Sequence, residues 1–204
     1  MAELRLSGVR PLVIKVGGSL SETGRLGGVL EMLSAAQVPI VIVPGGGPFA
    51  DAVRSLQREM SFDDAVAHRL AMLAMEQMAE WMVAQRPGLK VAQTIDEMSD
   101  CIMDGQIPVW APLRMIGDDE TIATSWSATS DSLSARLAEL VDARLILLKS
   151  VGVAKDVSAE ELARQGVVDI LFPEIVARSG VSWSIFGPAD DAALAALLAG
   201  GGGA

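Results

Sequence analysis

Two glycine-rich turns are the segments of this sequence best suited to chemistry. KVGGS at residues 15–19 and PGGGP at residues 44–48 each end a run of β-branched and aliphatic residues. Glycine lets the backbone approach a ligand and present successive N–H groups, and a helix that follows adds its positive N-terminal end. Either motif alone is compatible with a plain connection between a strand and a helix. Two such turns after neighbouring strands predict one shared site for phosphate groups.

Lysine side chains are the second candidate feature, because only four occur in a chain whose net charge is −10. Lys15 and Lys149 lie within or at the end of strongly apolar runs, where a charge is otherwise hard to explain. An exposed turn lysine is the simple alternative for Lys15. The motif LLKSVGVAKD at residues 147–156 contains Lys149 and Lys155, which we expect to reach phosphates at the edge of a sheet.

Two further polar positions leave alternatives open. In SWSATSDSL at residues 125–133, Thr129 or Ser130 is suited to cap a helix that Asp131 begins. An aspartate in the first turn of a helix is also a routine partner of the helix dipole, so a structural role for Asp131 is equally compatible with the pattern. His68 is the only histidine, and we weigh a contact with a substrate against the more common structural role.

The elements that position these residues alternate between strands and helices, which is typical of a mostly parallel sheet covered by helices on both faces. Apolar runs predict strands at residues 11–16, 39–43, 107–110, 144–149 and 181–186. Helical patterns predict a first helix that ends near residue 36 and another helix that begins near residue 158. Further helices are predicted over residues 48–60, 61–85, 94–105, 129–141 and 190–199. Residues 111–126 are predicted to be irregular or hairpin-like. We expect one domain over residues 1–199 and a flexible tail at residues 200–204.

Helix starts are predicted from capping boxes, in which a hydroxyl residue is followed three positions later by an acidic one. The pairs are Ser61 with Asp64, Thr94 with Glu97, and Ser158 with Glu161.

The long helix predicted over residues 61–85 has a wide apolar face formed by four methionines and a tryptophan. Methionine and tryptophan suit a protein core and a dimer interface equally well, so both interpretations stay open. The residues are Met72, Met75, Met78, Trp81 and Met82.

Composition excludes several classes of protein. No stretch approaches the roughly 18 to 20 apolar residues of a membrane span, and the N-terminus lacks the pattern of a secretory signal. The lone Cys101 cannot form an internal disulfide, so we expect a soluble protein of the reducing cytoplasm. Because the chain is acidic and has no cluster of lysine and arginine, we expect no nucleic-acid partner.

The order of the motifs resembles the amino acid kinase superfamily along nearly the whole chain. The matching segments are VIKVGGSL, PGGG, TSDSLSARLAELVDA and LILLKSVGVAKD. This resemblance implies a three-layer αβα sandwich, usually dimeric, that transfers the γ-phosphoryl group of ATP with Mg²⁺ to a small-molecule acceptor.

The same resemblance implies roles for individual residues. Lys15 would stabilise the transferring phosphoryl group, and Asp131 would orient the lysines or the metal. Nucleotide contacts would come from Gly17, Gly18, Ser19, Ser150, Gly152 and Lys155, and acceptor contacts from Gly45, Gly46, Gly47 and Ser130.

The chain departs from other superfamily members in three places. Many members have Thr-Asp where this chain has Lys149-Ser150. The C-terminal Gly-Gly-Met…Lys segment, which supplies a second catalytic lysine in many members, is replaced by DILFPEIVARSG, and we expect Lys149 to take over that charge. The hairpin that carries a carboxylate-binding arginine in acetylglutamate kinases is not found, which argues against that substrate.

A narrower likeness lies in PFADAVR, FDDAVAHRLAMLAMEQ, SWSATSDSL and LLKSVGV. These segments are similar to short members that include the aminomethylfuran phosphate kinases of methanofuran biosynthesis, although Ser127 stands where we expect aspartate. The likeness implies a phosphomonoester acceptor, with Asp51 pairing an amine, Arg54 meeting the phosphate and His68 nearby. Asp51 and Arg54 are equally compatible with ordinary surface positions on a helix. A carboxylate or nucleoside monophosphate kinase, and a non-catalytic nucleotide-binding or storage protein, are the alternative functions.

Overall fold

A parallel β-sheet forms the centre of the computed structural model, which describes residues 10–154 and 156–201. Among these residues, six strands lie in the order β3-β4-β2-β1-β5-β6, and every neighbouring pair runs parallel. The strands are β1 (Leu12–Val16), β2 (Ile40–Pro44), β3 (Leu89–Ala92), β4 (Ile107–Trp110), β5 (Arg144–Leu148) and β6 (Trp183–Phe186). The predicted mostly parallel α/β sheet is therefore confirmed.

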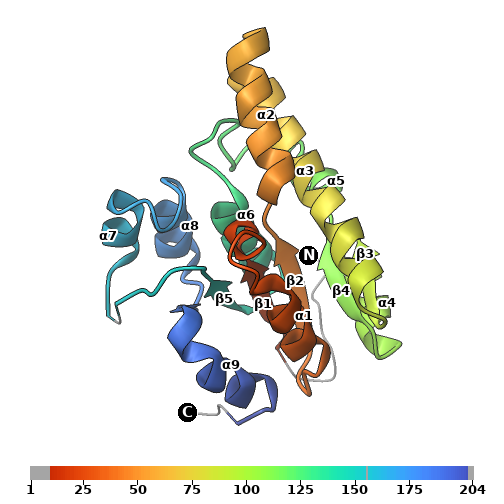
Figure 1. Cartoon of the computed structure of the whole chain (residues 1–204). Coiled ribbons are helices and arrows are strands. Elements are labelled where there is room, and N and C mark those ends of the chain that lie inside the picture. The colour runs from red at the N-terminus through yellow and green to blue at the C-terminus, as the bar shows by residue number, and fades with distance from the viewer. Residues whose placement is uncertain (1–9, 155, 202–204) are drawn as a thin grey trace.

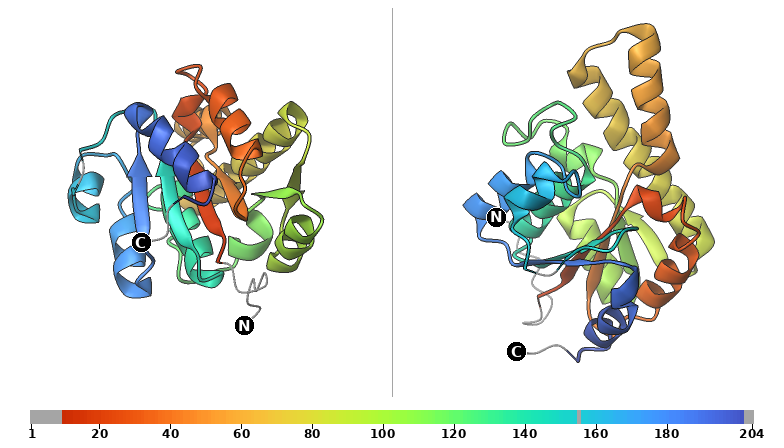
Figure 2. Two further views of the ribbon diagram at one scale, coloured as in Figure 1. Left: turned by 90° about the horizontal axis from the view of Figure 1, so that it is seen from below. Right: turned by 60° about the vertical axis from the view of Figure 1, so that its left-hand side comes forward.

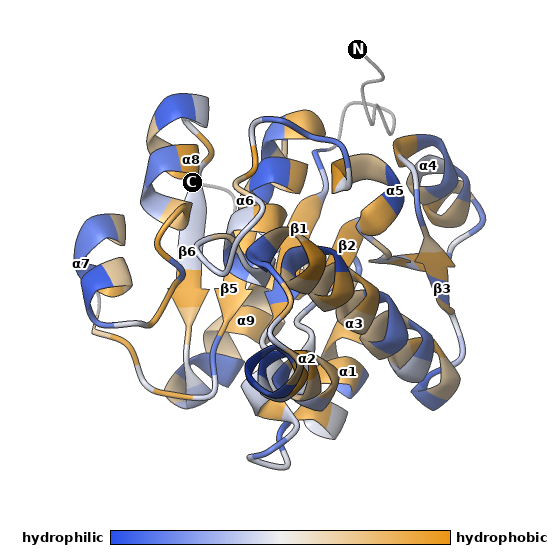
Figure 3. Ribbon diagram, turned by 90° about the horizontal axis from the view of Figure 1, so that it is seen from above, coloured by the Kyte–Doolittle hydropathy of each residue, from blue (hydrophilic) through white to orange (hydrophobic). Residues whose placement is uncertain are grey.

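Helices cover both faces of the sheet (Figures 1 and 2). Helices α6 (Ser130–Leu140) and α8 (Phe172–Ser179) pack on one face, and α1 (Leu26–Ser34) and α9 (Asp191–Leu198) pack on the other. Each face buries its own apolar cluster, and hydrophobic residues accordingly concentrate in the strands and the inner sides of the helices (Figure 3). The three-layer αβα arrangement is confirmed.

The remaining helices lie at the edges of these layers. They are α2 (Gly47–Met60), α3 (Asp64–Gln85), α4 (Ile95–Met103), α5 (Leu113–Ile116) and α7 (Ala159–Arg164), with short 3₁₀ turns at Gly18–Leu20 and Pro188–Asp190. Helices α2 and α3 pack against each other, and their connected ends project beyond the sheet (Figures 1 and 2). Within the described residues, none of the helices combines the length and apolar character that crossing a lipid bilayer requires.

The methionine face of α3 belongs to the core. Met72, Met75, Met78 and Met82 are each at most 4% exposed, because they pack against both apolar clusters of the sheet. Of the two interpretations, the core one is confirmed for these four residues, whereas Trp81 is 40% exposed.

The predicted caps are correct at two helices and wrong at a third. Thr94 and Ser158 each accept a hydrogen bond from the backbone N–H three residues later, as expected. Helix α3 is capped by Asp63, which accepts from Val66 N, rather than by Ser61. Ser61 ends α2 instead, in the left-handed conformation (φ 56°), and its N–H donates to Gln57.

Three elements were not predicted. Strand β3 has only four residues, and α5 is a single turn within the segment predicted to be irregular. Helix α8 begins at Phe172-Pro173, where proline in the first turn favours a helix start. No strand is found in residues 111–126, so the hairpin alternative for that segment is wrong. Of the predicted tail, residues 202–204 lie outside the described residues.

Candidate active site

The two-residue period of the strands brings the two buried lysines to one face of the sheet. Side chains alternate along a strand, so Lys15 points to the same face as Val13, and Lys149 to the same face as Leu147. Val13 and Leu147 both belong to the apolar cluster beneath α6. Because β1 and β5 are parallel neighbours in register, with Lys15 opposite Leu147, the lysines lie near the same carboxyl-terminal edge.

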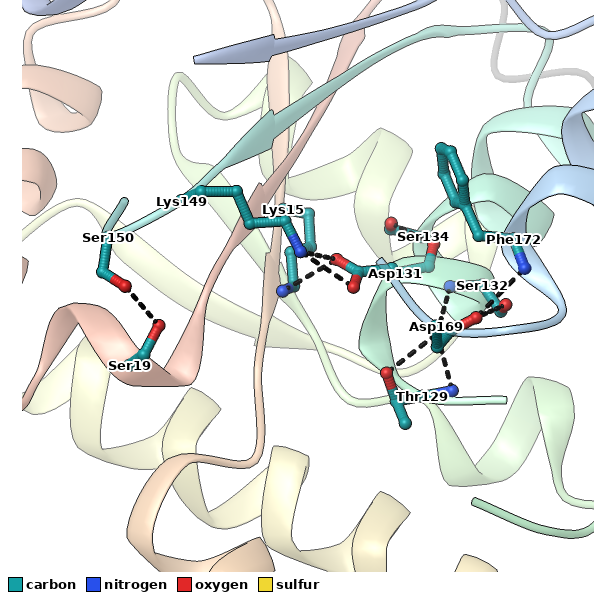
Figure 4. Close-up of polar contacts among 10 residues, drawn as sticks. All are labelled: Lys15, Ser19, Thr129, Asp131, Ser132, Ser134, Lys149, Ser150, Asp169 and Phe172. Atoms are coloured by element: carbon teal, nitrogen blue, oxygen red, sulfur yellow. Dashed lines mark hydrogen bonds and ion pairs between the residues drawn. The ribbon is translucent and has the colours of Figure 1, made fainter. Parts of the chain in front are cut away.

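Asp131 of α6 lies between the two lysines and bonds to both (Figure 4). Lys15 Nζ is 2.9 Å from Asp131 Oδ1, and Lys149 Nζ is 2.8 and 2.9 Å from the two carboxylate oxygens. All three residues are buried, with 5–8% of their surface exposed. The structure thus brings together the three residues predicted to be catalytic.

Burial and the neighbouring charges shift the pKa values of Asp131 and Lys149. Burial by itself raises the pKa of Asp131, but the two ammonium groups outweigh it, so the net pKa is lowered and the carboxylate stays ionised. Burial and the neighbouring Lys15 ammonium lower the pKa of Lys149 to about 8, against the opposing effect of Asp131. Two positive charges and one negative charge leave one positive charge in excess near neutral pH.

The first turn of α6 is held by a residue from a distant part of the chain. Asp169, between α7 and α8, accepts hydrogen bonds from Thr129 N, Thr129 Oγ1 and Ser132 N at 2.8–3.0 Å. It also accepts from Ser132 Oγ and from Phe172 N (Figure 4). Thr129, one of the two residues predicted to cap α6, occupies the N-cap position, although its side chain makes no cap bond there.

The glycine turns pack directly against each other. A Cβ atom on Gly18 would lie 2.6 Å from Gly47 N, and one on Gly45 would lie 2.6 Å from Gly18 N. Gly47 also has a positive φ of 51°. Glycine is therefore required here first for close backbone packing, which places both turns at one edge of the sheet, as the sequence predicts.

The segment after β5 joins the first turn. Ser19 Oγ and Ser150 Oγ are 2.9 Å apart, and Gly17 N donates to Leu148 O. The backbone of Gly152 packs on Gly187, where an added Cβ would lie 3.0 Å from Gly152 Cα. Lys155, also predicted to bind the nucleotide, lies outside the described residues.

A cavity of about 260 Å³ opens beside the glycine turns, between α2, α3 and the start of α6. It is lined by every residue predicted to bind the acceptor: Gly45, Gly46, Gly47, Asp51, Arg54, His68 and Ser130. Its walls also include apolar side chains for which the sequence predicted no role in binding, among them Met72, Met75 and Trp126.

The polar groups of this cavity are held by defined contacts. Arg54 Nη1 is 3.0 Å from Asp51 Oδ1, and the Arg54 guanidinium lies 4.3 Å from the centre of the Trp126 ring. Trp126 Nε1 donates to Gln57 Oε1 at 2.6 Å, which fastens the loop before α6 to α2. Burial lowers the pKa of His68, against a backbone hydrogen bond with Ser125, so the imidazole is neutral at physiological pH.

A second cavity of about 360 Å³ lies along β6 at the edge of the sheet. Its walls are formed by residues 153–157 that the structure describes, by the strand itself and by Asp190. This is the edge to which the LILLKSVGVAKD motif leads.

Sequence reasoning missed Trp126 and Asp169. A tryptophan inside a largely polar loop is a signal for a binding wall, but its partners on α2 are far away in sequence. Asp169 precedes Phe172-Pro173 by three residues, which is a capping pattern for α8, whereas its bonds to α6 have no local signal.

Comparisons with known proteins agree with this fold. A protein of Methanocaldococcus jannaschii, [5-(aminomethyl)furan-3-yl]methyl phosphate kinase, is 28% identical over 138 residues, which cover 67% of this chain but only 63% of that protein. The crystal structure of uridylate kinase from Archaeoglobus fulgidus shares the fold, with a TM-score of 0.63, 19% identity, and coverage of 90% of this chain and 93% of that one. The model of the Amino acid kinase family matches residues 10–165, and the chain therefore belongs to that family.

Proposed function

We propose that this protein is an ATP-dependent kinase that transfers the γ-phosphoryl group to a small phosphomonoester bearing an amine. The observation that carries the proposal is the buried Asp131 carboxylate between the Lys15 and Lys149 ammonium groups. Two ammonium groups and one carboxylate leave one net positive charge at the edge of the sheet, beside two turns with glycine backbone. This charge suits the negative charge that spreads over the phosphoryl oxygens in the transition state.

In the proposed reaction, the bond between the γ-phosphorus and the oxygen bridging to the β-phosphate breaks, and ADP keeps the electron pair. A new bond forms between that phosphorus and an oxygen of the acceptor phosphate, which gives a diphosphate. That oxygen is already ionised, so no general base is needed. Lys15 and Lys149 neutralise the moving group, and Asp131 holds their positions.

We propose that ATP lies across the first glycine turn, with its base toward the cavity along β6 and its phosphates at Gly17, Gly18 and Ser19. Ser150 and Gly152 continue this surface, and Lys155 is proposed to extend it. Among the described residues, no three histidine, cysteine or acidic side chains converge as a metal site. Mg²⁺ is therefore proposed to arrive bound to the nucleotide phosphates, whose charge it neutralises.

The acceptor is proposed to occupy the cavity beside the second glycine turn. Asp51 and Arg54 form an exposed ion pair there, and such pairs contribute little to stability. In a ligand that carries both an ammonium and a phosphate, the ammonium can bind Asp51 in place of Arg54, and the phosphate can bind Arg54 in place of Asp51. A carboxylate or a nucleoside monophosphate leaves Asp51 without a cation. The name of the Methanocaldococcus jannaschii relative describes an acceptor with both groups, which supports the aminomethylfuran phosphate type.

The test is ADP release by the purified protein with Mg²⁺ and ATP across an acceptor panel. The panel contains aminomethylfuran methyl phosphate, its analogue without the amine, carboxylates and nucleoside monophosphates. Acceptor-dependent ADP with the aminated phosphate supports the proposal, and its loss in Asp51→Asn but not in Glu59→Gln, on the same helix, supports the amine contact. Hydroxylamine traps acyl phosphates, so it identifies a carboxylate acceptor. Tight ATP binding without turnover refutes a kinase for these acceptors and favours a storage role.

We also propose that residues 1–199 work as one domain, that the protein is a homodimer and that it acts in the cytoplasm. Light scattering of the full chain tests the oligomeric state.

A further inference from the structure

The carboxylate of Asp169 accepts more hydrogen bonds than any local capping residue in the described part of the chain. Oδ2 accepts from Thr129 N, Thr129 Oγ1 and Ser132 N, and Oδ1 accepts from Ser132 Oγ and Phe172 N. These five donors come from the N-termini of two helices, α6 and α8. One partly buried side chain therefore joins the C-terminal helical region to the helix that carries Asp131.

The residues that Asp169 holds flank the central carboxylate of the active site. Thr129 and Ser132 lie on either side of Asp131, so their bonds to Asp169 fix the orientation of the turn from which Asp131 reaches Lys15 and Lys149 (Figure 4). Asp131 has no room to adjust on its own, because it is buried and bonded to both ammonium groups. A change in the direction of this turn moves the carboxylate relative to the lysines.

We propose that Asp169 is a positioning residue for phosphoryl transfer, which sets the first turn of α6 and thereby the place of Asp131 between the lysines. This proposal rests on the proposed kinase function. In many superfamily members the corresponding C-terminal region supplies a second catalytic lysine. In this chain we propose that the region supplies Asp169 instead, which orients Asp131.

Charge gives the proposal an observable consequence beyond helix stability. Among the described residues, Lys15 on β1, Asp131 on α6 and Asp169 before α8 act on the charge of the Lys149 ammonium, and the Arg25 guanidinium bonds to the backbone oxygen of Lys149. Asp169 favours the protonated form of Lys149, while burial and the charge of Asp131 raise the pKa of Asp169 itself. Removal of the negative charge at residue 169 therefore lowers the pKa of Lys149.

The experiment compares Asp169→Asn, Asp169→Ala and the milder Ser132→Ala with the wild-type full chain. Thr94→Ala is the matched control, because it removes a helix cap from α4 at the opposite end of the sheet. We expect Asp169→Ala to lower kcat on the order of 10-fold, the loss typical when a partner that orients an active-site ligand is removed. KM for ATP and acceptor is expected to stay within about twofold of wild type, since Asp169 lines neither of the cavities proposed to hold them.

The pH profile separates positioning from stability. In Asp169→Asn the alkaline limb of kcat is expected to move to lower pH, and Thr94→Ala is expected to lose stability without moving it. Wild-type kcat and an unshifted limb in folded Asp169→Asn overturn the proposal, and leave Asp169 as a helix cap only. If Asp169→Ala does not fold, Ser132→Ala is used in its place. This variant is expected to show a smaller fall in kcat, and an unchanged kcat would overturn the proposal.

A measurement without turnover separates this proposal from the kinase proposal. The reactivity of Lys149 toward an acylating reagent, followed by mass spectrometry as a function of pH, reports its ionisation directly. A lower apparent pKa in Asp169→Asn than in wild type supports the positioning role even if no acceptor is phosphorylated. Equal values overturn that role, whatever the catalytic result.

Discussion

The charge balance of the Lys15–Asp131–Lys149 cluster predicts that two of its variants differ in stability although both lose activity. The native cluster has one excess positive charge. Asp131→Asn raises this excess to two and removes the carboxylate that bonds to both buried ammonium groups, which leaves only the more distant charge of Asp169 near Lys149. Lys149→Met removes one ammonium, and leaves Lys15 and Asp131 as a neutral pair at 2.9 Å. Methionine also fills the apolar space along the lysine stem.

The magnitudes follow from the distances. At 2.8 Å, the separation of Lys149 Nζ and Asp131 Oδ1, Coulomb's law with an effective dielectric constant of about 20 gives roughly 6 kcal/mol of attraction. The desolvation of each ion offsets several kcal/mol of this attraction, so loss of the carboxylate is expected to cost about 3–5 kcal/mol of folding free energy. For Lys149→Met, lost attraction and relieved desolvation nearly cancel, and we expect a change within about 1 kcal/mol.

Urea unfolding followed by circular dichroism measures the difference. With a slope of about 2.5 kcal/mol per molar urea, Asp131→Asn is expected to lower the midpoint by about 1.5 M, and Lys149→Met to leave it nearly unchanged. Equal destabilisation of the two variants would refute the charge-balance reasoning, because Lys149 would then be a structural partner rather than a retained excess charge. An unchanged midpoint in Asp131→Asn would refute it as well, since it would mean that water solvates both lysines.

Three further outcomes are expected. Lys15→Ala lowers kcat on the order of 10²-fold or more with the fold intact, as measured by ADP release and circular dichroism, and full activity contradicts its role. Lys149, with a pKa lowered to about 8, must be protonated to neutralise the phosphoryl group, so kcat is expected to fall as pH rises through about 8. Lys149→Arg is expected to move this alkaline limb to higher pH, and a profile identical to wild type argues against the catalytic role of Lys149. Gly18→Ala places a Cβ 2.6 Å from Gly47 N and is expected to lower the thermal midpoint and ATP affinity, whereas Gly28→Ala on α1, where an added Cβ meets no atom within 4 Å, is expected to lower neither; calorimetry of both variants tests the contrast.

The parts of the site that can be predicted from sequence are residues whose type is unfavourable in the strand or turn that their neighbours predict. Lys15 and Lys149 stand out because a charge in an apolar strand is costly. The glycine turns stand out because runs of two and three glycines weaken a chain unless its backbone must closely approach another group. Asp131 could be placed at a helix start, although its bonds to both lysines depend on which strand lies beneath that helix.

The parts that could not be predicted depend on contacts between distant segments. The five donors of Asp169 and the bond from Trp126 to Gln57 join positions that share no local pattern. Strand β3 escapes notice because four residues of an edge strand give little periodicity. The cap at Asp63 was misplaced because Ser61 with Asp64 satisfies the same pattern, and only the left-handed backbone of Ser61 shows that it ends the preceding helix.

The strand order also has a consequence during synthesis of the chain on the ribosome. Strand β1 lies between β2 and β5, yet β5 begins only at Arg144. While a nascent chain contains β1 to β4, one edge of β1 lacks the strand that pairs with it in the finished sheet, and Lys15 lacks the carboxylate of Asp131 until α6 follows. Open strand edges invite misassociation, and pairing over such a sequence distance is slow. We therefore expect the first half of this protein to be prone to misassociation until the second half emerges, and the charge cluster to be complete only when β5 and α6 have joined the sheet.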